Sequence, residues 1–182
     1  MHKLRNVIVI SGPAGSGKTT YALKLAEKYG LRYFSAGQLF RKIARERGLT
    51  LSELSKIAEK DYSIDLEIDR RTLEEALKGN IVIDGHLTAW VVKEVADLRI
   101  YVTAPLMVRV RRIAERDGIS LREAFYETVT REFSQRRRFL EIYGVDVANI
   151  SWFDLVINTE KFSIEETFAI IDKVASKILR KP

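Results

Sequence analysis

The chain has 182 residues, a formal net charge of +6 and no cysteine. This length fits one domain with a single core, and the lack of cysteine excludes disulfides and thiolate metal sites. Two histidines, His2 and His86, leave little room for a structural zinc site. Because no stretch approaches the roughly 20 apolar residues that cross a bilayer, and no signal peptide is evident, we expect a cytoplasmic protein.

Five short apolar runs predict β-strands. The runs are continuous, which is typical of strands buried on both faces of a parallel sheet that helices cover. In chain order they span residues 6–10, 33–34, 81–83, 98–102 and 155–157. The predicted fold class is therefore α/β, with residues 1–182 in one domain.

Segments with helical periodicity separate the predicted strands. They cover residues 19–29, 38–47, about 50–58, about 64–78, about 106–143 and about 163–179. The long fifth segment is interrupted at Asp117 and Gly118, where Ser120 can cap a second helix. Ser163 and Glu166 have the spacing of a capping box, which predicts the start of the last helix.

A glycine-rich loop follows the first predicted strand. Residues 12–19 read GPAGSGKT and match G-x-x-x-x-G-K-[ST], the P-loop pattern, between a strand and an amphipathic helix. Glycines let successive backbone N–H groups point at phosphate oxygens, and the helix N-terminus adds positive potential. The predicted phosphate-binding residues are Gly12, Pro13, Ala14, Gly15, Ser16, Gly17, Lys18, Thr19 and Thr20.

Two side chains of this loop have predicted chemical roles. Lys18 is expected to reach the β and γ phosphates as a catalytic residue, and Thr19 to place its hydroxyl on Mg²⁺. The ligands that this combination indicates are a nucleoside triphosphate, which we take to be ATP, and Mg²⁺. The loop does not identify the acceptor of the phosphate.

Arginine is the only basic residue type between positions 99 and 138. It forms two groups, Arg109, Arg111, Arg112 and Arg116, then Arg131, Arg136, Arg137 and Arg138. The planar guanidinium suits bidentate phosphate binding, so the groups could clamp a small anionic substrate or follow a nucleic-acid backbone. Interspersed glutamates also allow a solvated helix face. Because aromatic residues do not interleave with the arginines, as they do in single-strand stacking platforms, nucleic acid is the less favoured partner.

Three further segments carry a family resemblance. SAGQLFR, residues 35–41, follows the second predicted strand, DGH, residues 84–86, ends the third, and the arginine-rich helices follow the fourth. In this order the chain resembles the nucleoside monophosphate kinases over nearly its whole length. It is most similar to archaeal cytidylate kinases through the stretches SAGQLFRKIARERGLTLSEL, EIDRR, RIAERDGISLREA and RRFLEIYGVDV, the last leading to DLVINTEKFSIEE.

The resemblance implies a fold and an activity. The fold would be a P-loop NTPase fold with five parallel strands in the order 2-3-1-4-5 and helices on both faces. A helical insertion at about residues 36–79 would bind the acceptor, and a lid would cover about residues 106–146. The activity would be transfer of the γ-phosphoryl group of ATP to CMP or dCMP with Mg²⁺. The partners would be small nucleotides, with no membrane and with a monomer favoured over an oligomer.

The resemblance also assigns acceptor and metal residues. Arg41, by its place in Ser-x-Gly-x-x-x-Arg, would hold the acceptor phosphate, and Asp84 would hold the metal through water, unless it is only a turn residue of Asp-Gly. The implied acceptor-binding set is Ser35, Gly37, Arg41, Asp69, Arg70, Gly85 and His86.

The lid arginines would neutralise phosphate charge, because phosphoryl transfer depends mainly on positioning and electrostatic stabilisation. Arg131 and Arg137 are predicted to be catalytic, and Arg138, with Arg109 and Arg112 of the earlier helix, could close over the phosphates.

His86 departs from the family pattern, since many nucleotide kinases carry arginine at this position. A contact to the acceptor phosphate, a plain turn residue and a general base all stay open for His86. The acceptor also stays open, because UMP or AMP could replace CMP. An ATPase that acts with RNA is the alternative from another class.

Overall fold

The structure is a computed structural model that describes residues 5–179, so both ends of the predicted domain lie outside the described residues. Its centre is a sheet of five parallel strands in the order β2-β3-β1-β4-β5, which confirms the predicted order. The strands are β1 Val7–Ser11, β2 Arg32–Ser35, β3 Ile81–Gly85, β4 Leu98–Thr103 and β5 Leu155–Asn158. Each predicted apolar run falls in one of them, shifted at its ends by no more than two residues.

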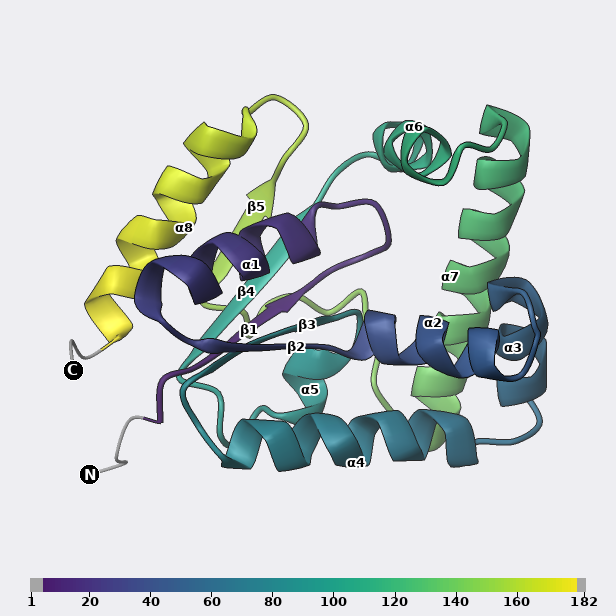
Figure 1. The fold of residues 1–182 in the computed structure, drawn as a ribbon, viewed down its shortest axis with the longest axis horizontal. Helices are drawn as coiled ribbons and strands as arrows, with labels where there is room; N and C mark the ends of the chain where they lie inside the picture. The colour runs from purple at the N-terminus through teal and green to yellow at the C-terminus, as the bar shows by residue number, and fades with distance from the viewer. Residues whose placement is uncertain (1–4, 180–182) are drawn as a thin grey trace.

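Helices cover both faces of the sheet (Figure 1). They are α1 Lys18–Tyr29, α2 Ala36–Glu46, α3 Leu51–Ala58, α4 Ser63–Leu77, α5 Thr88–Val91, α6 Leu106–Asp117, α7 Leu121–Tyr143 and α8 Ile164–Ile178. Alternate residues of β1 enter different cores: Ile8 and Ile10 pack with α1 and α8, while Val7 and Val9 pack with α4 and α5. This two-sided burial explains why the strand sequences are apolar throughout.

The helix ends follow their capping residues. Ser120 and Ser163 each begin a helix with a capping box, formed with Glu123 and Glu166. The cap at Ser120 and the box at Ser163 were predicted, while the part of Glu123 was not. Helix α6 ends at Gly118, which has a left-handed backbone. Helix α5 was not predicted, because four residues are too few to show a helical period.

Helices α2 and α3, which follow β2, and helices α6 and α7, which follow β4, lie beyond the ends of the strands, while α4 runs back along the sheet (Figure 1). Helices α2, α3 and α4 form their own apolar cluster around Phe40 and Leu54, in the segment where the acceptor insertion is predicted. Helices α6 and α7 pack through a cluster that includes Val110 and Ala124, where the lid is predicted. The sheet thus places three groups beyond the carboxyl ends of its strands: the loop after β1, helices α2 and α3, and helices α6 and α7.

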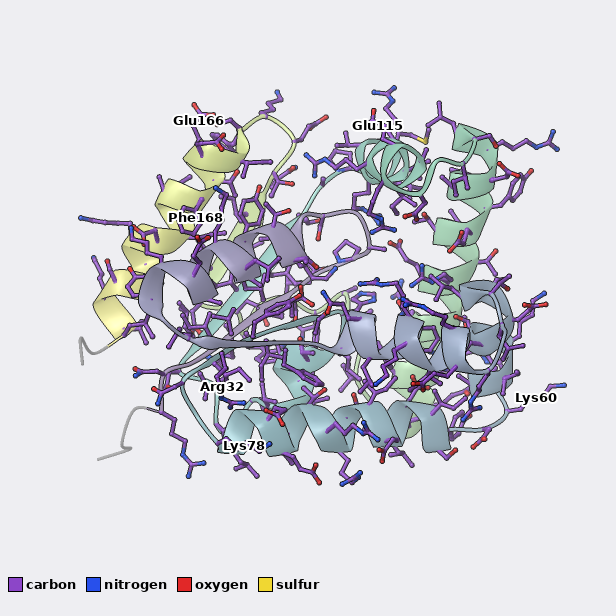
Figure 2. The ribbon with its side chains drawn as sticks, viewed as in Figure 1. Arg32, Lys60, Lys78, Glu115, Glu166 and Phe168 are labelled. Carbon is purple, nitrogen blue, oxygen red and sulfur yellow. The ribbon has the colours of Figure 1, made fainter. Side chains whose placement is uncertain are left out.

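The edge strand β2 is fixed to α4 by charged side chains. Figure 2 shows Arg32 and Lys78 near the same end of α4, where both pair with Glu75. Within residues 5–179, no helix has the length and apolar content needed to cross a membrane.

Candidate phosphate-transfer site

The glycine-rich loop, residues 12–17, turns sharply between β1 and α1. Gly12 and Gly15 have φ angles of +145° and +75°, in the region that favours glycine. A Cβ atom at Gly12 would lie 2.0 Å from the carbonyl oxygen of Val102, and one at Gly15 would lie 2.6 Å from that of Arg109. The loop therefore packs directly on β4 and α6, and side chains at these positions would displace it.

Lys18 begins α1 and folds back over the loop. Its Nζ donates a hydrogen bond to the carbonyl of Pro13 at 2.8 Å. Burial lowers the pKa of Lys18 to about 8; the Asp84 carboxylate opposes this shift, and the Arg109 guanidinium adds to it. Lys18 is therefore mostly charged at neutral pH, and its ammonium lies on the backbone of the loop.

Asp84 is a buried carboxylate at the end of β3 that collects three hydroxyl groups. It accepts hydrogen bonds from Thr19 Oγ1 at 2.7 Å, from Tyr33 at 3.0 Å and from Ser35. Ser35 also caps α2 by accepting a hydrogen bond from the backbone N–H of Gln38. The side chains predicted to hold Mg²⁺, Thr19 and Asp84, thus touch each other, and both offer the oxygen atoms that Mg²⁺ prefers.

A cavity of about 390 Å³ lies over the loop and brings most of the predicted residues together. It also exposes a cluster of cationic side chains, as expected of a site for phosphate groups. The predicted residues that line it are Ala14, Gly15, Gly17, Lys18, Thr19, Thr20, Ser35, Gly37, Arg41, Asp84, Gly85, His86, Arg112 and Arg131. Gly12, Pro13 and Ser16 belong to the loop but do not line this cavity.

Two arginines face the cavity with unused donors. Arg131 is only 16% exposed, its Nε is buried without a partner among the described residues, and Glu127 lies 3.4 Å away. Burial lowers the pKa of Arg131. The Arg41 guanidinium lies beside Gly37, where a Cβ atom would be 3.7 Å from Nη1. The Ser16 hydroxyl in the loop is likewise buried without a partner in residues 5–179. These donors fit anionic groups such as phosphates.

Two predicted residues lie away from the cavity. Arg137 is 60% exposed and pairs with Glu141 at 2.8 Å, because six residues after Arg131 it falls on another face of α7. Arg70 lies on the exposed side of α4, where it pairs with Glu67 and Glu74. The structure therefore does not bring Arg137, predicted to be catalytic, or Arg70, predicted to bind the acceptor, to this cavity.

Arg109 and Arg138 are buried in ion pairs and do not face the cavity as free cations. Arg138, 1% exposed, donates from Nε to Asp65 at 2.7 Å, from Nη2 to Asp65 at 3.2 Å and from Nη1 to Ser134 at 2.7 Å. This pair joins α4 to α7. Sequence reasoning missed Asp65, whose one available clue is its place four residues before Asp69 on the same helix face.

Asp69 lines a narrow pocket of about 70 Å³ beside the cavity over the loop, together with Gly37, His86 and Arg131. Its carboxylate accepts a hydrogen bond from the Tyr143 hydroxyl. Burial raises the pKa of Asp69 to about 6, the hydrogen bond opposes this shift, and the nearby Asp65 charge adds to it.

His86 pairs with Gln135, a residue that the sequence did not single out. Nδ1 of His86 lies 2.9 Å from Oε1 of Gln135. Burial lowers the pKa of His86 to about 4; the bond to Gln135 opposes this, while the charges of Lys18, Arg109 and Arg131 lower it further. The imidazole is therefore neutral at pH 7. Gln135 lies four residues after Arg131, which places both on the cavity side of α7.

The chain is similar to known kinases along most of its length. Residues 7–161 match the model of the cytidylate kinase-like family. A cytidylate kinase of Staphylothermus marinus is 62% identical over 96% of this chain and 99% of its own, and one of Desulfurococcus amylolyticus is 58% identical over 96% and 95%. A shikimate kinase of Acinetobacter baumannii, solved with shikimate, shares the fold with a TM-score of 0.62 at 18% identity, covering 96% of both chains. The combination of this match with a P-loop, a carboxylate at the end of β3 and an arginine-lined cavity shows that the chain belongs to the cytidylate kinase-like family.

Proposed function

We propose that this protein transfers the γ-phosphoryl group of ATP to CMP, and to dCMP, giving ADP and CDP or dCDP. The observation that carries the proposal is the single cavity in which the P-loop faces Arg41 and Arg131. A donor triphosphate and an acceptor monophosphate repel each other, so their approach needs cations on both sides. The similarity to relatives named cytidylate kinases supports CMP as the acceptor.

The loop supplies the donor side of the reaction. Its backbone N–H groups and the start of α1 are suited to the β and γ phosphates, and Lys18 would leave Pro13 to reach the γ phosphate. Thr19 and Asp84 would hold Mg²⁺, Asp84 through water, and the ion would screen the phosphate charge. Within the described residues no group of three or more acidic or histidine side chains forms a complete cage, so phosphate and water oxygens would fill the remaining positions.

Arg41, Arg131 and the turn at Gly85 supply the acceptor side. Arg41 and Arg131 would bind the acceptor phosphate and the charge that develops during transfer. Ser35, Gly37 and His86 line the same space, and Asp69 lies in the adjoining pocket, which would take the base. The neutral His86 can donate or accept hydrogen bonds but adds no charge. The arginines would therefore supply the positive charge that stabilises the acceptor phosphate.

A coupled assay of Mg-ATP with CMP, dCMP, UMP, AMP and GMP tests this function directly. We expect turnover with CMP and dCMP. Turnover confined to UMP or AMP would identify a kinase for another acceptor. RNA-stimulated ATP hydrolysis without any monophosphate, weakening steeply as salt rises, would support the RNA-dependent ATPase instead. The monomeric state is part of the proposal and is tested by light scattering after size exclusion.

Arg41→Ala is expected to raise the KM for CMP about 10- to 100-fold, the loss of a hydrogen-bonded charge contact, with a small effect on the KM for ATP. Arg45→Ala is the matched control, since Arg45 lies one turn later on α2 and is exposed. Steady-state kinetics with each substrate varied in turn gives both constants. An effect confined to ATP would place Arg41 on the donor side.

His86→Ala is expected to weaken CMP binding equally at every pH between 5.5 and 8.5, because an imidazole with a pKa of about 4 does not titrate there. Calorimetric titration across this range, with His86→Asn as a variant that retains hydrogen bonding to Gln135, measures the effect. A pH-dependent step that disappears in His86→Ala would show a charged histidine at the phosphate. Unchanged affinity would leave His86 as a turn residue.

A further inference from the structure

Three successive carbonyl groups of the phosphate loop lie within hydrogen-bonding distance of donors outside it. The Ala14 carbonyl accepts from Nη1 of Arg109 at 3.0 Å, and the Gly15 carbonyl lies 3.4 Å from Nη1 of Arg112. The Ser16 carbonyl lies 3.2 Å from the Thr159 hydroxyl, which is equally close to the carbonyl of Thr103. Contacts from α6 and from Thr159, which directly follows β5, thus support the outer side of the loop.

The direction of these carbonyls fixes the direction of the neighbouring N–H groups. In a trans peptide the C=O and the following N–H point in opposite directions. Holding the carbonyls of Ala14 and Ser16 outward therefore turns the N–H groups of Gly15 and Gly17 inward, toward the cavity. These are the donors that a polyphosphate needs, and a loop held in place loses less conformational freedom on binding.

The guanidinium of Arg109 forms its hydrogen bonds with other groups of the protein. It is buried, and besides Ala14 it donates from Nε to the carbonyl of Ala104 at 2.9 Å. Nη1 also pairs with one carboxylate oxygen of Glu132, and Nη2 lies 3.3 Å from the other. With these partners satisfied, Arg109 has little left to offer a phosphate.

We propose that Arg109 is a positioning residue that orients the P-loop for the donor phosphates through the Ala14 carbonyl, with Arg112 and Thr159 completing the outer support. The inference rests on the proposed binding of ATP phosphates by this loop. Glu132 extends the support to the lid, since it follows Arg131 directly on α7. The pair between the buried Arg109 and the partly exposed Glu132 therefore joins the outer support of the loop to α7.

Calorimetric binding of ATP, of inorganic tripolyphosphate and of CMP to the full chain tests the proposal. The main variant is Arg109→Met with Glu132→Gln, which removes the guanidinium donors without leaving a charged carboxylate beside the loop. Arg111→Met is the matched control, because Arg111 carries the same charge on the same helix and is exposed. Circular dichroism selects a temperature at which every variant is folded.

We expect the double variant to bind ATP and tripolyphosphate about 100-fold more weakly, with CMP affinity unchanged, because backbone N–H groups that turn away lose their hydrogen bonds to the charged phosphates. Arg109→Lys retains the positive charge but not the planar set of guanidinium donors, so it should show most of this loss of affinity. Thr159→Val should show a smaller loss that Thr159→Ser restores. A double variant that binds tripolyphosphate as the wild type does, an equal loss for CMP, or full recovery in Arg109→Lys would overturn the proposal.

The binding test separates this inference from the proposed activity. If no acceptor is phosphorylated in the coupled assay, the proposed function fails, but tripolyphosphate affinity still reports the state of the loop. If CMP is phosphorylated and the double variant binds ATP normally, the activity stands and the role of Arg109 fails.

Discussion

Lys18→Ala is expected to lower kcat by about three orders of magnitude, since it removes the one side-chain cation of the loop that reaches the transferred phosphate. The chain should still fold, because the only hydrogen bond of the ammonium within the described residues is to the carbonyl of Pro13. The coupled assay gives kcat, and circular dichroism gives the folded fraction. Lys24→Ala, on the same helix but away from the cavity, is the control.

The pH dependence of the wild type provides a second measure of Lys18. Its ammonium is charged below a pKa of about 8, so kcat/KM for ATP, which reports the free enzyme, should fall as pH rises through that value. Bound triphosphate favours the charged form, so the fall in kcat should occur at higher pH. A Lys18→Ala chain that is unfolded, or one that keeps normal kcat, would contradict a catalytic lysine.

Asp65→Ala is expected to lower the free energy of unfolding by about 3–5 kcal/mol, because it leaves the Arg138 guanidinium buried without its carboxylate. Denaturant unfolding followed by circular dichroism measures the change. Glu74→Ala breaks the surface pair with Arg70 on the same helix and should have little effect.

A second substitution distinguishes two causes of the lost stability, the unpaired buried charge of Arg138 and the loss of packing. Arg138→Met in the Asp65→Ala background removes the unpaired cation and should recover part of the lost stability. If Asp65→Ala and Glu74→Ala unfold at the same denaturant concentration, the buried pair between α4 and α7 does not stabilise the fold as the geometry indicates.

The sequence was sufficient to predict the strands of the sheet and the phosphate loop. Apolar runs such as residues 81–83 are continuous because both faces of the strand are covered. Such a run can be recognised in the amino-acid sequence alone. The loop is defined by local backbone geometry, so GPAGSGKT carries it completely. The strand order came from family resemblance, since no property of the individual runs specifies which strands become neighbours.

The acceptor side was less predictable because it depends on how α7 is rotated against its neighbours. Arg131 and Arg137 are equivalent in the sequence, yet one lines the cavity and the other pairs with Glu141. Gln135 and Asp65 look like ordinary polar residues of amphipathic helices; their partners, His86 and Arg138, are 49 and 73 residues away. Only tertiary packing distinguishes such residues from solvated ones.

The hydroxyl groups that donate hydrogen bonds to Asp84 also indicate when this site forms during folding. Thr19, Tyr33 and Ser35 are 65, 51 and 49 residues away from this carboxylate along the chain. Contacts between such distant residues form only after long loops have closed, and parallel pairing makes them slow. The contact between Thr19 and Asp84, which are proposed to hold Mg²⁺, therefore does not exist in a chain that has formed its helices but not paired β1, β2 and β3. Recovery of nucleotide binding during refolding should accordingly report completion of the central sheet, and not the earlier formation of α1 and its loop.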